Sequence, residues 1–318
     1  MGSNRIETGC KGVLGAALKK TAFLLGMTLM LSAGSALAET SAQFFKSYQD
    51  YSDAGKEFLD KIEPKTGAIN LADGVHLELK DKFYFLDHDD AVQVLTEGWG
   101  NPANTTVETL GMIFPVDYDP LADGTWGIEL RHEKIGYVDD LDAATIDYSD
   151  LLRTMQSDTN ARNEERVKEG FSPVTLVGWA SPPTYDTVNK RLHWAKELQF
   201  GEATSRTLNY DVRFLGREGV FVMSYIATMD QLPEIKQSLD EVLNLASFAE
   251  GKRYADYLPG VDTAATIGIG GLIAGKAAIK TGLLAVALVA LKKFGFLLLL
   301  PVIWLWRFVR SKFSRSGT

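Results

Sequence analysis

The stretch at residues 208–228, LNYDVRFLGREGVFVMSYIAT, decides the fold. It holds two runs rich in aromatic and β-branched residues, which are typical of strands. The four residues between these runs begin with Gly216 and end with Gly219, so the connection is very short. Two strands joined by such a loop pair with each other in an antiparallel hairpin. The sequence therefore predicts a hairpin over residues 208–228, and the rest of the fold is built outward from it.

Further strands and helices are expected on both sides of this hairpin. Strand-like runs lie at residues 75–79, 83–86, 106–116, 125–137, 174–180 and 192–200. Helical spacing of nonpolar residues occurs at residues 42–62, 89–98, 148–169 and 232–248. This mixture predicts an α+β fold, in which an antiparallel sheet has helices covering at least one face. Because no long linker divides residues 39–260, we expect one domain there with an N-terminal helical arm.

The charge of this central domain excludes one class of partner. Residues 39–260 carry 21 Lys or Arg and 39 Asp or Glu, a net charge of −18, whereas the whole chain carries −8. Nucleic-acid binding needs patches of Lys and Arg to neutralise phosphates. We therefore expect no nucleic-acid partner.

The first 38 residues have the three parts of a secretory signal peptide. Lys19 and Lys20 precede a nonpolar run at residues 21–31, and the motif Ala-Leu-Ala follows at residues 36–38. We expect residues 1–38 to be removed on export. The alternative is an uncleaved anchor, which is disfavoured because the nonpolar run is shorter than the ~20 residues that a membrane span needs.

The other end of the chain has the composition of a membrane segment. We expect a membrane region at residues 261–309, followed by a basic tail at residues 310–318 that stays in the cytoplasm, as positively charged flanks do. Lys292 and Lys293 would lie at mid-depth, where each charge costs about 3 kcal/mol. Such a pair needs a snorkelling route, an acidic partner or a break in the helix. Whether the region is one helix or a broken hairpin therefore stays open.

An ordered series of motifs runs through the second half of the chain. It comprises Gly178-Trp179-Ala180, Pro183-x-Tyr185-Asp186, Leu192-x-Trp194-Ala195, Tyr210-Asp211-x-Arg213-x-Leu215-Gly216-Arg217-x-Gly219 and Tyr254-Ala255-Asp256-Tyr257-x-Pro259-Gly260-x-Asp262. This series resembles a bacterial family of uncharacterised membrane-anchored proteins over roughly residues 69–309. The resemblance implies an exported domain and a C-terminal transmembrane region, but it implies no activity. More loosely, the hairpin and a following helix that ends in Ala246-Ser247-Phe248 resemble the end of the Mog1/PsbP-like sandwich.

These features together predict a location. The export signal and the basic tail place the main domain outside the cytoplasm, in the periplasm, and the C-terminus inside. We expect the chain to be tethered in the bacterial inner membrane with a single net crossing.

Few residue patterns in the chain are those that carry catalysis. The four histidines, His76, His88, His132 and His193, show no close zinc-binding spacing, and the only cysteine, Cys10, lies in the expected signal peptide. The common serine-hydrolase and phosphate-loop motifs do not occur. We therefore expect no catalytic residue, metal or cofactor.

Two acidic segments leave an alternative open. Residues 117–124 and 139–142 each gather three aspartates, and oxygen-rich loops of this kind suit Ca²⁺. Their spacing departs from the EF-hand pattern, so solvated turns are the favoured interpretation.

The motif series supplies the candidate binding residues. Aromatic and charged side chains of this series could line a groove in which a peptide, glycan or lipid headgroup stacks and pairs. The candidates are Trp179, Tyr185, Asp186, Trp194, Arg213 and Arg217. In the alternative interpretation, which is favoured, Trp194 and Tyr210 fill the core, while Asp186 and Arg213 form a structural ion pair.

Two classes of function follow from these expectations. The first is a non-enzymatic envelope protein at the membrane, which binds an envelope protein partner or assembles with copies of itself. The second is a glycan or peptide hydrolase that uses a pair of carboxylates. A deep cleft with two facing carboxylates would favour the hydrolase, whereas a shallow aromatic surface would favour binding.

Overall fold

The computed structural model describes residues 40–101, 103 and 106–275. The chain divides into two units, Met1–Ala38 and Glu39–Thr318, and every described residue belongs to the second. The expected signal peptide, the lysine pair Lys292 and Lys293, and most of the expected membrane region lie outside the described residues. Within the described part, no helix is long and nonpolar enough to cross a membrane.

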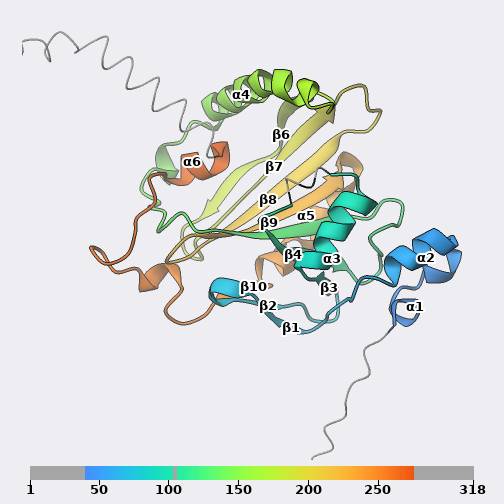
Figure 1. Ribbon diagram of the computed structural model, residues 1–318. Helices are drawn as coiled ribbons and strands as arrows, with labels where there is room; N and C mark the ends of the chain where they lie inside the picture. Colours follow the sequence, from blue (N-terminus) through green and yellow to red (C-terminus); the bar gives the residue numbers. More distant parts are fainter. Residues whose placement is uncertain (1–39, 102, 104–105, 276–318) are drawn as a thin grey trace, which may run out of the picture. The chain divides into compact units, whose positions relative to one another are not determined.

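A seven-stranded antiparallel sheet forms the centre of the domain (Figure 1). Across the sheet its strands are β3 (Phe83–Leu86), β4 (Thr109–Pro115), β5 (Gly127–Glu133), β9 (Val220–Thr228), β8 (Thr207–Leu215), β7 (Arg191–Phe200) and β6 (Val174–Asp186). The predicted hairpin is confirmed as β8 and β9, which pair from Thr207 opposite Thr228 to Leu215 opposite Val220. The expected α+β class is confirmed as well.

A second, three-stranded sheet contains β1 (Ala68–Asn70), β2 (Val75–Glu78) and β10 (Ala246–Phe248), with β2 in the middle. The strand β10 lies where the sequence predicted the end of a helix. That helix, α5 (Leu232–Leu243), stops at Asn244, and the next residues pair with β2 instead. Pairing with the distant strand β2 determines the structure of these residues, and the local spacing of nonpolar residues does not reveal that pairing.

The remaining helical segments surround the large sheet. They are α1 (Ser41–Phe44), η1 (Tyr48–Asp50), α2 (Asp53–Leu59), η2 (Ala72–Gly74), α3 (His88–Gln93), η3 (Val94–Gly98), η5 (Ala143–Thr145), α4 (Tyr148–Lys168), η6 (Met229–Gln231), η7 (Tyr254–Asp256) and α6 (Ile269–Ala274). The helical arm expected at residues 42–62 is therefore three short pieces. Ser52 explains one break, because it is extended and its side chain caps a new helix by accepting a hydrogen bond from the Gly55 N–H.

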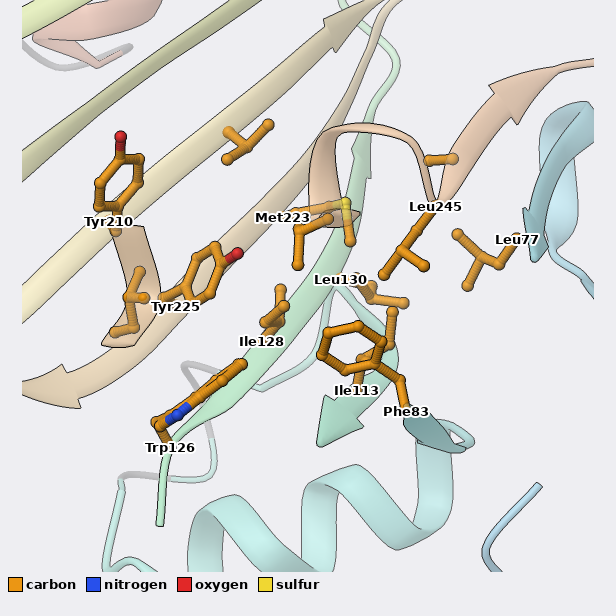
Figure 2. Packing of buried hydrophobic residues seen from close by; sticks show 14 of the residues in the cluster. Leu77, Phe83, Ile113, Trp126, Ile128, Leu130, Tyr210, Met223, Tyr225 and Leu245 are labelled. Carbon is orange, nitrogen blue, oxygen red and sulfur yellow. The ribbon is translucent and has the colours of Figure 1, made fainter. Parts of the chain in front are cut away.

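One face of the large sheet carries a continuous nonpolar core (Figure 2). Its fully buried members on the strands include Ile113, Ile128, Leu130, Val212, Met223 and Tyr225. Ile235 and Val242 of α5 and Leu77 of β2 cover this face. We call this the nonpolar face. Burying each such Leu, Ile or Val side chain stabilises the fold by roughly 1.5–3 kcal/mol.

The opposite face is covered in two separate patches. Over β3 and β4, side chains such as Tyr84 and Phe114 pack against the N-terminal helices α1 to α3. Over β6 and β7, Leu176 and Trp194 pack against Met155 of α4 and against α6. Between these patches, β5, β9 and β8 present polar side chains. We call this the polar face.

Glycine is required at one end of the β8–β9 loop by close approach of the backbone. A Cβ atom at Gly219 would lie 2.2 Å from the carbonyl oxygen of Glu133 on the neighbouring strand β5. The Gly216 N–H donates to the Gly219 carbonyl oxygen at 2.8 Å, which closes the loop. Only a residue without a side chain fits at Gly219.

The edge strand β6 is protected along its length. Asn163 of α4 bonds to both backbone groups of Val174, and Gln156 of α4 donates to the carbonyl oxygens of Leu176 and Val177. Further along, β6 contains a Pro-Pro pair at residues 182–183, which an edge strand tolerates because its outer N–H groups need no partner strand.

Candidate functional site

A cavity of about 580 Å³ lies between α4, α6 and the polar face of the sheet. This volume falls in the range of small-ligand sites. The roof of the cavity, α4, is 21 residues long, yet Met155 is its one buried residue. Tyr148, Leu151 and Leu152 of α4 also pack against the sheet but are only partly buried, and the space beneath the helix is lined by charged, polar and nonpolar groups.

Register places a row of polar side chains on the floor of this cavity. Glu129 on β5 lies opposite Ser224 on β9, and Ser224 lies opposite Asp211 on β8. Asp211 in turn lies opposite Trp194 on β7. Residues opposite one another in a sheet share a face, so these four side chains cross the cavity floor in one line.

Asp211 is the most enclosed charge in the row. Its Oδ1 accepts a hydrogen bond from Ser224 Oγ at 2.8 Å, and its Oδ2 lies 3.1 Å from Lys196 Nζ. Burial acts to raise the pKa of Asp211, but Lys196, Arg213 and the Ser224 hydrogen bond outweigh it and hold that pKa below its ordinary value. Asp211 is therefore a buried, ionised carboxylate.

Glu129 has the opposite tendency. Its Oε2 lies 3.2 Å from Arg131 Nη1, and Arg131 Nη2 donates to Ser224 Oγ at 3.4 Å. Burial raises the pKa of Glu129; Arg131 partly opposes this, and the charge of Asp211 adds to it. The floor thus holds two carboxyl groups whose pKa values are displaced in opposite directions.

Arg213 and Trp194 form a stacked pair beside this row. The Arg213 guanidinium carbon lies 5.3 Å from the centre of the Trp194 ring, and Arg213 Nη1 lies 3.2 Å from Glu133 Oε2. Two donors of this pair, Trp194 Nε1 and Arg213 Nε, are buried and have no hydrogen-bond acceptor among the described residues. An unsatisfied buried donor costs about 1–3 kcal/mol, so such donors mark a place where an acceptor is missing.

The structure brings only two of the six sequence-derived candidates, Trp194 and Arg213, to the cavity. Trp179 packs beside α4, and its Nε1 donates to the Tyr148 carbonyl oxygen at 3.2 Å. Asp186 caps the turn after β6 by accepting hydrogen bonds from backbone N–H groups of residues 188 and 189. The two remaining candidates, Tyr185 and Arg217, hold the C-terminal segment in place.

Tyr185 belongs to a cluster around Asp140. Its hydroxyl donates to Asp140 Oδ2 at 2.7 Å, and Lys190 Nζ lies 2.7 Å from the same oxygen. The Tyr254 hydroxyl donates to Asp140 Oδ1 at 3.2 Å. Burial acts to raise the pKa of Asp140, but these partners lower it overall. The cluster ties η7 to the sheet.

Arg217 and Asp142 fasten the segment that follows η7. Arg217 Nε and Nη2 donate to the two carboxylate oxygens of Asp262 at 2.7 and 2.8 Å. Asp142 accepts hydrogen bonds from the N–H groups of Ile269 and Gly270 at the start of α6, at 2.9 and 3.0 Å. Residues 261–275, which the sequence assigned to the membrane region, therefore pack on this domain as far as they are described.

The alternative interpretation of the candidates is half right. Trp194 and Tyr210 are both buried, on the polar and nonpolar faces respectively. The expected ion pair of Asp186 with Arg213 is wrong, because Arg213 pairs with Glu133 and Asp186 caps its own turn. Asp186 bonds within its own turn because the backbone N–H groups of that turn are close to it in sequence.

Sequence reasoning missed most of the cavity floor. Glu129, Arg131, Lys196, Asp211 and Ser224 were not among the candidate residues, although Asp211 belongs to the motif series. The available signal was alternation, since β5 reads Glu129-Leu130-Arg131 and β8 contains a polar residue at every second position from Asn209. Alternation ordinarily indicates a face in water, and nothing local shows that α4 covers it.

The fold and the cavity define a class: a helix-roofed antiparallel α+β domain with a polar, ligand-sized cavity. The chain belongs to the family described as "Protein of unknown function (DUF2167)", whose model matches residues 63–303. This confirms the expectation of an uncharacterised family. Comparison with curated proteins gives no match. Among solved structures, the chain is similar to the cyanobacterial PsbP (CyanoP) of Synechocystis sp. PCC 6803, with 9% identity and a TM-score of 0.35 over 59% of this chain and 92% of that one.

Proposed function

We propose that this chain is a membrane-anchored envelope protein whose exported domain is a non-enzymatic binding module, with the cavity beneath α4 as its ligand site. The main domain lies in the periplasm, and residues 276–309 anchor it in the inner membrane with the C-terminus in the cytoplasm. The ligand is another component of the cell envelope or a part of one.

One observation carries the ligand site: charged side chains are buried on a roofed sheet face, beside two donors that find no acceptor within the part of the chain that the structure describes. Buried ion pairs add little to stability compared with nonpolar residues of similar volume. If packing alone determined the residues beneath α4, they would be nonpolar, as they are on the nonpolar face of the same sheet. Perturbed charges in a cavity are typical of functional sites.

Site-specific photo-crosslinking tests the ligand site. A photoreactive residue at Thr159, which lies on α4 and lines the cavity, should give an adduct in intact cells. The matched control is the same residue at Val167, which lies on the same helix, is 55% exposed and does not line the cavity. An adduct of equal yield at Val167, or none at Thr159, would contradict the proposal.

Reporter fusions test the anchor. A reporter that is active only outside the cytoplasm should work when fused near Lys252 and fail when fused after Thr318. Activity at both positions would indicate an even number of crossings, with a break near Lys292 and Lys293.

A second candidate function is hydrolysis of a glycan or peptide by the carboxyl pair of Glu129 and Asp211. The favouring observation is that their pKa values are displaced in opposite directions, which is how one acid and one base are obtained from two carboxyl groups. They lie two strands apart, with Cα atoms about 10 Å from each other. If hydrolysis occurs, the ligand recovered from Glu129→Gln should be intact, whereas the wild type should yield cleaved product. Identical ligands from both would exclude it.

A further inference from the structure

The cavity concentrates positive charge within an acidic domain. Residues 39–260 hold 21 basic and 39 acidic side chains. The cavity lining takes five of those basic residues and four of the acidic ones: Arg131, Arg162, Arg166, Lys196 and Arg213, with Glu129, Glu165, Glu169 and Asp211. Cations are therefore strongly enriched there relative to the rest of the domain. A local excess of cations favours an anionic ligand group.

The exposure of the charges points the same way in two of the three ion pairs that involve a cation of the cavity within the described part of the chain. In the pair of Lys196 with Asp211, the lysine side chain is 22% exposed and the aspartate 8%. In the pair of Arg131 with Glu129, the arginine is 28% exposed and the glutamate 10%. In both pairs the cation is the more accessible partner. An entering ligand thus meets ammonium and guanidinium groups first, and these bind oxyanions.

Nonpolar side chains line part of the same cavity, and we call them its nonpolar wall. Met155 and Leu176 line it from α4 and β6, and the partly exposed Leu198 and Ile226 line it from β7 and β9. The C-terminal end of α6 adds Leu272. A site that joins exposed cations to a nonpolar wall suits a ligand with an anionic end and a hydrocarbon end.

The position of the cavity along the chain indicates where such a ligand comes from. Gly275, the last described residue, lines the cavity. In the sequence, only five residues separate it from the strongly nonpolar stretch at residues 281–306, which the proposed function places in the membrane. The cavity is thereby held within a short distance of the bilayer, where amphiphiles are concentrated.

We propose that the cavity binds one single-chain amphiphile with an anionic oxygen head, either a fatty carboxylate or an alkyl phosphate. The head contacts Lys196 and Arg131, and the hydrocarbon chain lies along Met155, Leu176 and Leu198. This inference rests on the proposed function, since it names the ligand class of the same site.

Native mass spectrometry of the full chain, purified in dodecyl maltoside, tests the ligand class. The neutral detergent in excess competes for any purely nonpolar site. Dodecyl phosphate and laurate are the two anionic probes, and they distinguish the two head groups. Inorganic phosphate supplies the head alone, and dodecyltrimethylammonium supplies the tail with a cationic head. At least one anionic amphiphile should bind about tenfold or more tightly than both of these controls, with one molecule per chain.

Paired substitutions locate the binding. Lys196→Met with Asp211→Asn removes a cavity ion pair without leaving a lone buried charge, and it should weaken binding of the anionic amphiphile about tenfold. The control, Lys252→Met with Glu218→Gln, removes a pair outside the cavity and should bind as the wild type does. Thermal unfolding of both variants verifies that each is folded.

Three outcomes would overturn the inference. Equal binding of dodecyltrimethylammonium or inorganic phosphate would show that the anionic amphiphile is not the ligand class. Unchanged binding in the cavity variant would place the amphiphile elsewhere. If no probe binds while Thr159 still gives its crosslink, the ligand class is wrong and the proposed function stands; if the Thr159 crosslink also fails, both are wrong.

Discussion

The two faces of the large sheet are built from the same strands but differ in what they bury. On β5, Leu130 points into the nonpolar core and is fully buried, whereas its neighbours Glu129 and Arg131 point to the cavity. The nonpolar face is one continuous cluster covered by α5 and the small sheet. The polar face has two nonpolar clusters with charged residues between them.

This difference separates stability from function within one sheet. The nonpolar face buries the largest single nonpolar cluster, and the hydrophobic free energy of this burial stabilises the fold. The polar face gives up some of that free energy to hold charges at fixed positions under a helical roof. Variants that affect the two faces differently therefore test the distinction.

Lys196→Met should have the largest effect. It leaves Asp211 buried without its closest cation, which costs about 3–5 kcal/mol in the free energy of unfolding. The double variant with Asp211→Asn should recover most of this loss. Urea unfolding of the wild type, both single variants and the double variant gives the coupling energy directly. Additive losses would mean that the polar face is not held by buried pairs.

Leu130→Ala should cost about 2–5 kcal/mol, because it opens a cavity in the nonpolar face. Its effect should be confined to stability. The crosslink at Thr159 should keep its yield at temperatures where the variant is folded. A variant that loses the crosslink while it remains folded would show that the two faces are not independent.

Asp142→Ala should cost about 0.5–2 kcal/mol, because it removes the side-chain cap of α6. Faster hydrogen exchange at the amides of α6 would report the local loss. Asp139→Ala is the matched control, since the Asp139 carboxylate is exposed and accepts only the Leu141 N–H. Equal exchange in both variants would mean that the cap does not hold α6 on the polar face.

Glu129→Gln should have the smallest effect, and its sign depends on pH. The pKa of Glu129 is raised on folding from 4.5, mainly by burial. The folded state therefore binds the Glu129 proton more tightly than the unfolded state does. The free energy of unfolding falls as pH rises from the unfolded-state pKa of Glu129 towards its higher folded-state pKa. The variant should match the wild type near pH 3 and be the more stable one at pH 7, as measured by thermal unfolding. A variant that is less stable at pH 7 would mean that Arg131 outweighs the burial of Glu129.

The sequence was sufficient for elements whose pattern is local. The β8–β9 hairpin follows from two strand-like runs and a short glycine-bounded loop, and α4 was expected within one residue of its observed end. It was not sufficient where a distant partner decides, as at β10, which pairs with β2 rather than continuing α5.

The candidate site shows the same limit. Trp194 and Arg213 were found because the motif series contains them. Glu129 lies on β5, which joins the site only through register, and Lys196 follows Trp194 by two residues on β7 but lies outside the motifs. Arg213 was assigned to Asp186, but its Nη1 lies 3.2 Å from Glu133 Oε2 on β5 instead. A row that crosses several strands has no signature in any one of them.

The protected edges of the sheet limit how copies of this domain can associate. At β6, the amide side chains of Asn163 and Gln156 occupy backbone groups that an incoming strand would need, and the prolines at residues 182–183 have no N–H to offer. At the other edge, Lys65 pairs through its backbone with Phe85 of the short strand β3. Addition of a strand from another chain, the usual route to fibrils and to edge-to-edge polymers, is therefore blocked at both ends. Copies of this domain that meet along the large sheet would therefore be joined by side chains rather than by backbone pairing.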